Sequence, residues 1–312
     1  MAVIFTLLSM LLASGEDLLE KKAVTSKTEE ALKTLVWYSM FNAVVTCLVI
    51  AFGMDEAALM PHELVAKNPA VLLSPVLNCL TLLFALLAYK YVGVSVRNSF
   101  SNVDGFFFIM LLMIFYSVTG KASFAVRLFT PSAMIGTVLI ITAAIVYPNI
   151  NPHRNEEKEL PSTGDKDKKM LVIGIILAVT SAFFDGSESL VSSYLIGDDV
   201  VDSMDYIAML GLSQTVIGFV LWIGMSIRYK KIYNPFRKTE KIRCISQLLS
   251  LIADLLYVFA LSDDALIGVI LWNAFPILDI LGARIFLKEK LTRLQYTILF
   301  MLLIGAVLVS LS

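Results

Sequence analysis

Long uninterrupted runs of apolar residues, each about as long as a bilayer is thick, dominate this chain of 312 residues. A membrane-spanning helix needs about 17 to 25 mostly apolar residues, because each residue advances the helix by about 1.5 Å through a hydrocarbon core about 30 Å thick. Ten stretches are long enough, and they are 2–20, 33–53, 69–90, 93–117, 127–147, 170–195, 206–227, 244–261, 265–286 and 294–311. Hydrophobic residues make up 58% of the chain and charged residues 16%, which is not the composition of a soluble domain. We therefore expect an all-α polytopic membrane protein with ten transmembrane helices.

One long hydrophilic stretch, PNINPHRNEEKELPSTGDKDKK at 148–169, interrupts the apolar pattern. Its proline, glycine and charged residues are typical of a linker. It predicts a first five-helix repeat over 1–147 and a second over 170–312. Because five is an odd number of spans, the second repeat would be inverted relative to the first.

Lysine and arginine are distributed unevenly between the expected loops. Of 25 basic residues, the even-numbered loops hold only Lys67, Lys121 and Arg127. Since basic residues favour the cytoplasmic side, we expect both termini outside and the 148–169 linker in the cytoplasm, with the protein in the cell (inner) membrane. The first apolar run lacks the basic start of a signal peptide, so we expect it to remain as the first span.

Acidic residues interrupt two of these spans in a related way. In FFDGSESLVSSY, Asp185, Glu188 and Ser192 share one helical face. Laying 11–22 over 182–193 pairs Asp17 with Glu188 and Gly15 with Gly186. Lipid cannot satisfy such groups, so we expect them to face the bundle interior or a water-filled cavity. Capping of helix ends at the interface is the alternative reading.

Further polar residues lie within later apolar runs. Asp254 is near the middle of its span, with Tyr257 one turn further on the same face. In GVILWNAFPILDIL, Trp272 and Asp279 flank a proline that frees a backbone carbonyl. A second overlay of 103–108 on 272–277 pairs Asp104 with Asn273.

The sign of these intramembrane charges is informative, because no lysine or arginine lies deep in a span. A phosphate or nucleotide-sugar site would need a buried basic residue. The acidic set favours a cation, a zwitterion or protons.

At 270–311 the sequence resembles the closing repeat of the EamA-type transporters of the drug/metabolite transporter superfamily. The resemblance is carried by Pro276, Glu289, Leu291, Gln295 and Gly305. The first half resembles the pattern loosely, since Gly120 stands where an acid is expected. GSESLVSS is similar to a stretch of the choline permeases of that superfamily. The resemblance implies a ten-helix carrier made of two repeats that works by alternating access.

These observations predict a secondary transporter of a small cationic or zwitterionic metabolite, such as an amine, a quaternary ammonium or an amino acid. The expected substrate-binding or proton-coupling residues are Asp17, Asp104, Asp185, Glu188, Asp254, Tyr257, Trp272, Asn273 and Asp279. A transporter of a divalent metal such as magnesium stays open, because carboxylates and a free carbonyl supply oxygen ligands. An intramembrane enzyme or a non-transporting scaffold is a further alternative, although no catalytic motif is present.

We expect the lipid bilayer and a small-molecule substrate as partners, with no cofactor, no resident metal and no nucleic acid. The spacings Ser132/Gly136 and Ala306/Ser310 allow helices to pack closely, within one chain or between the copies of a homodimer.

Overall fold

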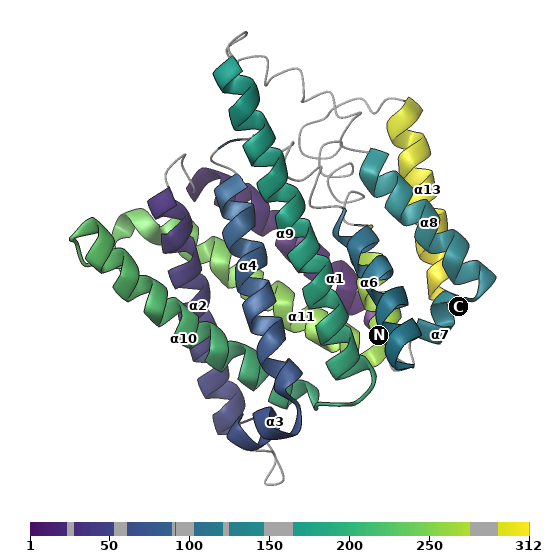
Figure 1. Cartoon of the computed structure of the whole chain (residues 1–312), viewed down its shortest axis with the longest axis horizontal. Coiled ribbons are helices and arrows are strands. Elements are labelled where there is room, and N and C mark those ends of the chain that lie inside the picture. The colour runs from purple at the N-terminus through teal and green to yellow at the C-terminus, as the bar shows by residue number, and fades with distance from the viewer. Residues whose placement is uncertain are drawn as a thin grey trace.

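The computed structural model describes residues 1–23, 28–52, 61–88, 91, 103–120, 125–146, 165–274 and 293–311. Every regular element in these ranges is a helix (Figure 1). The elements of the first half are α1 (Ala2–Ala23), α2 (Thr28–Phe52), α3 (Pro61–Lys67), η1 (Pro69–Leu72), α4 (Leu73–Ala88), α6 (Asp104–Thr119), α7 (Ala125–Leu128) and α8 (Pro131–Val146). Those of the second half are α9 (Asp165–Gly197), α10 (Ser203–Tyr229), η4 (Lys238–Glu240), α11 (Lys241–Trp272) and α13 (Arg293–Ser310).

Five segments are long and apolar enough to cross a bilayer. They are Glu29–Ala51, Pro69–Ala88, Val172–Gly197, Ser203–Tyr229 and Lys238–Trp272. Shorter apolar helices cover Ala2–Glu16, Asp104–Thr119, Pro131–Ala143 and Tyr296–Val309. Large apolar side chains are exposed on several of these helices, among them Leu48, Val138, Val216 and Phe300. The prediction of an all-helical protein with helices long and apolar enough to span a membrane is confirmed for the residues that the structure describes.

Helix ends lie where the sequence supplies a suitable residue. The side chain of Asp202 accepts a hydrogen bond from the backbone N–H of Met204 at 2.8 Å and so caps the start of α10. Gly120 ends α6 in the left-handed region with φ 64°, which costs glycine little because it has no Cβ.

The expected spans 244–261 and 265–286 begin within one continuous element. Helix α11 runs from Lys241 to Trp272 and is interrupted only at Asp264, whose φ and ψ are −161° and 101°. The Asp264 carboxylate accepts a hydrogen bond from the backbone N–H of Ile267 at 3.1 Å. It thereby caps the second segment, so a kink takes the place of the expected loop.

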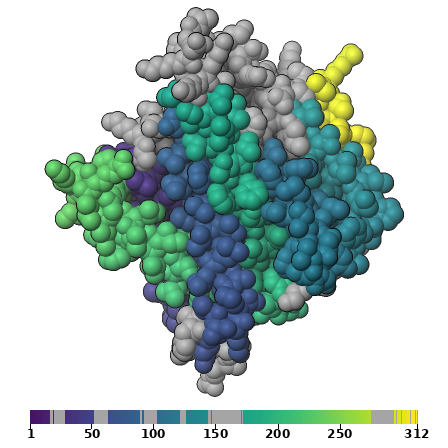
Figure 2. All heavy atoms as spheres, in the orientation of Figure 1, coloured from purple at the N-terminus to yellow at the C-terminus, as the bar shows by residue number. Residues whose placement is uncertain are grey.

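Helices of the first half pack mainly on helices of the second half. The principal neighbours are α1 with α11, α2 with α10, α4 with α9 and α8 with α13. Helix α9 also contacts α6 and α11 (Figure 1). Figure 2 shows α4 and α9 side by side on the face of the molecule turned to the viewer.

Two of these pairs are joined by a serine that donates to a backbone carbonyl of the neighbouring helix. Ser9 Oγ of α1 donates to the carbonyl of Ala253 in α11 at 2.6 Å. Ser181 Oγ of α9 donates to the carbonyl of Thr81 in α4 at 2.9 Å. Apolar helices gain no hydrophobic stabilisation from packing together in lipid, so hydrogen bonds between helices contribute to holding them together.

Helices α8 and α13 approach each other at glycine. A Cβ on Gly136 would lie 2.7 Å from the carbonyl oxygen of Gly305, and a Cβ on Gly305 would lie 2.7 Å from that of Gly136. Gly136, one of the small residues noted in the sequence, therefore packs within the chain.

Candidate functional site

Glu188 on α9 is held by two hydroxyl groups from two other helices. Ser74 Oγ, in the first turn of α4, donates to Glu188 Oε1 at 2.7 Å. The hydroxyl of Tyr206 on α10 donates to the same oxygen at 3.1 Å and lies 2.5 Å from Ser74 Oγ. Because Ser74 and Tyr206 are buried, this arrangement satisfies a carboxylate inside the bundle.

Asp254 on α11 has a partner of the same chemistry. The hydroxyl of Tyr38, on α2, donates to Asp254 Oδ2 at 2.7 Å. Tyr38 is 1% exposed, so its hydroxyl depends on this acceptor. The hydrogen bond from Ser9 to the carbonyl of Ala253 fixes the backbone of α11 beside Asp254.

The carboxyl groups of Asp104 on α6 and Asp185 on α9 lie close enough to interact with each other. Gly186 makes this approach possible, because a Cβ there would lie 2.5 Å from the carbonyl oxygen of Asp104. Two carboxyl groups can share a hydrogen bond only if one of them carries a proton. This pair is therefore suited to hold a proton.

These acidic residues form one electrostatic neighbourhood. Glu188 is near enough to Asp185 and Asp254 to interact with them electrostatically. Asp254 interacts with Asp185 in the same way. Tyr257 on α11 is within range of Glu188, Asp185 and Asp104. The fold thus gathers the acids from α6, α9 and α11, which the sequence singled out separately.

Of the other predicted site residues, Tyr257, Trp272 and Asn273 are described by the structure, whereas Asp17 and Asp279 are described in part or not at all. The rings of Tyr257 and Trp272 are tilted against each other with centroids 5.1 Å apart. The Asn273 amide donates to the carbonyl of Val269 at 3.0 Å and packs against Gly105. Asp17 lies on α1, but its side chain is outside the described part, and Asp279 lies outside the described residues altogether.

The tyrosine and serine partners were missed in the sequence. Tyr38, Ser74 and Tyr206 lie in apolar runs, where tyrosine and serine usually contribute to helix packing. A tyrosine in a membrane span needs an acceptor for its hydroxyl. That requirement was the available signal, but it does not say which acid is the acceptor.

Basic residues of the described part lie at the ends of the bundle. Arg243, at the start of α11, pairs with Glu30 of α2 at 2.5 Å and with Glu240. Arg127 on α7 pairs with Asp264 at the kink of α11. Among the described residues, no ion pair reaches Asp104, Glu188 or Asp254. In the same ranges, no three His, Cys, Asp or Glu side chains are grouped so that they could hold one metal ion.

The connection between α10 and α11 is tied to the Arg243 end. Tyr233 donates from its hydroxyl to Glu240 Oε2 at 2.9 Å. Burial, followed by this hydrogen bond to a carboxylate, raises the pKa of Tyr233 above its usual value.

Comparison with known proteins shows the fold and no more. No protein-family model and no curated protein matches the sequence. A solved structure described as "Crystal structure of protein" is similar, with a TM-score of 0.65 at 14% sequence identity. The similarity covers 99% of this chain and 96% of that one. The helical arrangement is therefore one that a solved protein also adopts over nearly its whole length.

Proposed function

We propose that this protein is a secondary transporter of a small cationic or zwitterionic metabolite. The observation that carries the proposal is the cluster of Asp104, Asp185, Glu188 and Asp254, in which buried hydroxyl groups from both halves of the chain donate to Glu188 and Asp254. Acidic residues inside a helical bundle are costly and mark sites for substrates, ions or protons. Because no described basic residue neutralises three of these four acids, a positively charged group is the chemical complement of the cluster.

The geometry suggests that some acids of the cluster bind the substrate and others carry the coupling proton. Glu188 and Asp254 each accept from a tyrosine hydroxyl, so an ammonium group can approach their other oxygen atoms while the hydroxyls keep the carboxylates in place. Tyr257 and Trp272 offer aromatic faces close by, which attract quaternary ammonium groups. The pair of Asp104 and Asp185 would hold and release the coupling proton.

The membrane potential is a second source of energy for a charged substrate. Moving one elementary charge across a bilayer is worth about 2.3 kcal/mol per 100 mV. Uptake of a cation into the cytoplasm would therefore be driven without a further coupled ion.

The architecture that we propose is ten transmembrane helices in two inverted five-helix repeats, 1–147 and 170–312. Helix pairing supports it. If α1 corresponds to α9 and α4 to α11, the pair α1 with α11 has its counterpart in α9 with α4. The serine bonds of Ser9 and Ser181 join these two pairs in the same manner, and the pairs α2 with α10 and α8 with α13 are their own counterparts.

Contacts at the two ends of the bundle suit alternating access, in which one end opens while the other stays closed. Arg243 with Glu30 joins α2 to α11 at one end, and Arg127 with Asp264 joins α7 to α11 at the other. By the distribution of basic residues, we propose that the Arg243 end and the linker are cytoplasmic, that both termini are outside, and that the protein lies in the inner membrane of the cell.

Binding by the purified protein tests the proposal first. Thermal unfolding is followed with choline, glycine betaine, polyamines, amino acids, neutral sugars and Mg²⁺, each at several concentrations. A ligand at 100 times its dissociation constant stabilises the folded state by about 2.7 kcal/mol. We expect stabilisation by an amine, quaternary ammonium or amino acid. Stabilisation by Mg²⁺ alone would favour the metal transporter instead.

Variants then link the ligand to the cluster. Asp254→Asn and Glu188→Gln should abolish both the stabilisation and uptake of the same ligand into proteoliposomes. Asp199→Asn is the matched control, because Asp199 is exposed in a turn with φ 52°, a conformation that asparagine also adopts. Full uptake by both cluster variants would remove the cluster from the mechanism.

A further inference from the structure

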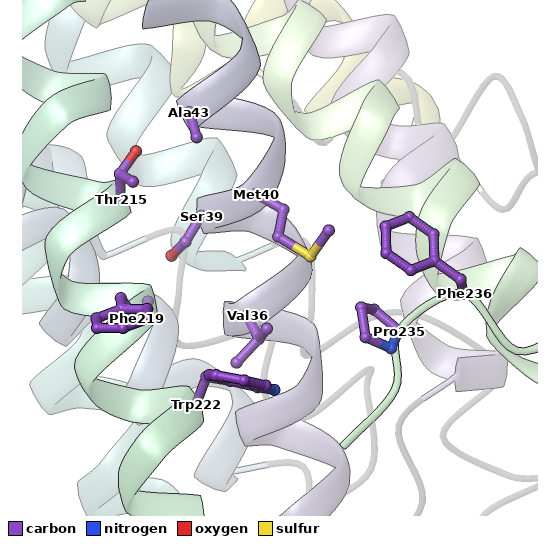
Figure 3. Close-up of a pocket in the computed structure, with 10 residues that line it drawn as sticks. Val36, Ser39, Met40, Ala43, Thr215, Phe219, Trp222, Pro235 and Phe236 are labelled. Atoms are coloured by element: carbon purple, nitrogen blue, oxygen red, sulfur yellow. The ribbon is translucent and has the colours of Figure 1, made fainter. Parts of the chain in front are cut away.

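An apolar pocket of about 300 Å³ lies between α2 and α10, and none of its lining residues belongs to the acidic cluster. Figure 3 shows Val36 and Met40 of α2, Phe219 and Trp222 of α10, and Phe236 of the following connection around it. Most of the lining residues belong to these two neighbouring helices, and Pro235 and Phe236 come from the connection that follows α10.

The two side-chain hydroxyl groups that line the pocket already donate hydrogen bonds within their own helices. Ser39 Oγ donates to the carbonyl of Leu35 at 2.9 Å, and Thr215 Oγ1 donates to that of Gly211 at 2.6 Å. Neither hydroxyl therefore needs a ligand as its acceptor. The pocket is suited to a purely apolar guest.

The pocket opens to the outer surface of the bundle. Phe219 and Phe236, which line it, are 60% and 78% exposed, and the neighbouring Val216 and Val220 are also exposed. In a membrane this surface faces lipid. A guest can thus enter sideways from the hydrocarbon, as an acyl chain would.

A basic segment adjoins the pocket. The exposed basic residues that follow the lipid-facing part of α10 are Arg228, Lys230, Lys231, Arg237, Lys238 and Lys241. None of them forms an ion pair with another described residue. The one acidic residue of this stretch, Glu240, is buried and pairs with Arg243.

Pocket and basic segment are held together. Trp222, a wall of the pocket, donates from Nε1 to the backbone carbonyl of Tyr233 at 3.0 Å. Phe236, another wall, directly precedes Arg237. A molecule with an apolar chain and an anionic head would therefore meet both features at once.

We propose that this site binds one anionic phospholipid, with an acyl chain in the pocket and the phosphate headgroup on the basic segment. A pocket of about 300 Å³ is at the small end of ligand sites, which suits a single chain. Each Lys or Arg near an anionic surface contributes about 1 kcal/mol, so the headgroup sets the preference. The proposal stands independently of the transported substrate.

The test compares phosphatidylglycerol with phosphatidylcholine of identical acyl chains, added to the detergent-purified protein. Retained lipid is counted by native mass spectrometry, and thermal unfolding is followed in parallel. We expect phosphatidylglycerol to be retained at least about tenfold more strongly, a difference of about 1.4 kcal/mol. Equal retention of the two lipids would overturn the proposal.

One variant tests recognition of the lipid headgroup, and another tests binding of the acyl chain. Replacing Lys230, Lys231, Arg237 and Lys238 by glutamine should reduce phosphatidylglycerol retention to the level of phosphatidylcholine. Ala43→Phe should fill the pocket and weaken retention, whereas Val44→Phe should not, because Val44 is 56% exposed and does not line the pocket. Unchanged retention in Ala43→Phe would show that only the headgroup is recognised and would also overturn the proposal.

Discussion

The contact between α6 and α9 at Gly186 gives a sharp test of the packing beneath the acidic cluster. In Gly186→Ala, the new methyl group would lie 2.5 Å from the carbonyl oxygen of Asp104 and 2.8 Å from the amide nitrogen of Phe108. Since ordinary contact begins near 3.4 Å, the shortfall is about 0.9 Å. Both atoms belong to the backbone, so no side chain can rotate to make room.

The expected cost follows from two opposing effects. Overpacking a well-packed contact costs about 1–3 kcal/mol, and a backbone neighbour favours the upper end. Alanine is better than glycine by about 1 kcal/mol in a helix interior. We expect a net loss of about 2 kcal/mol, which lowers the melting temperature by several degrees in a chain of this size.

A matched variant removes the effect of helix propensity. A Cβ on Gly224, in α10, would have no atom within 4 Å, so Gly224→Ala should gain about 0.5–1 kcal/mol. Thermal unfolding of the two variants in detergent should therefore differ by about 3 kcal/mol. A melting temperature of Gly186→Ala at or above that of Gly224→Ala would refute the close approach of α6 to α9.

Three further variants test polar contacts at the site and at the Arg243 end. Tyr38→Phe removes the donor to Asp254 and should reduce uptake about ten- to hundredfold, corresponding to about 1.5–3 kcal/mol for a hydrogen bond to a charged group; an unchanged rate would show that Asp254 is positioned without it. Arg243→Gln leaves the buried Glu240 without its basic partner, whereas Glu30 keeps Lys33, and it should cost about 3 kcal/mol in thermal unfolding, so an unaltered melting temperature would contradict a stabilising ion pair. The raised pKa of Tyr233 implies stability that is complete below its ordinary pKa near 10 and is lost as pH rises further. Tyr233→Phe should flatten this alkaline loss, and an identical pH profile would assign it to another group.

The apolar runs determined the class of protein before any tertiary contact was known. Span length and hydrophobicity are local properties, because the bilayer obliges each segment to satisfy its own backbone hydrogen bonds. The same local rule located the break near Asp264, where polar residues separate two apolar runs. It could not show that α11 continues through the break with only a kink, because the cap supplied by Asp264 depends on its side-chain geometry.

Helical periodicity likewise placed Asp185, Glu188 and Ser192 on one face of α9. What that face meets was decided by the packing of helices far apart in the sequence. Ser74 is 114 positions from Glu188, and Tyr38 is 216 from Asp254. A buried hydroxyl in an apolar run is stabilised by an acceptor, but many carboxylates satisfy that condition equally, and only the way the helices pack selects one. The sequence thus determined which acids needed polar partners inside the bundle, whereas the tertiary structure supplied the tyrosine and serine partners and decided the pairs.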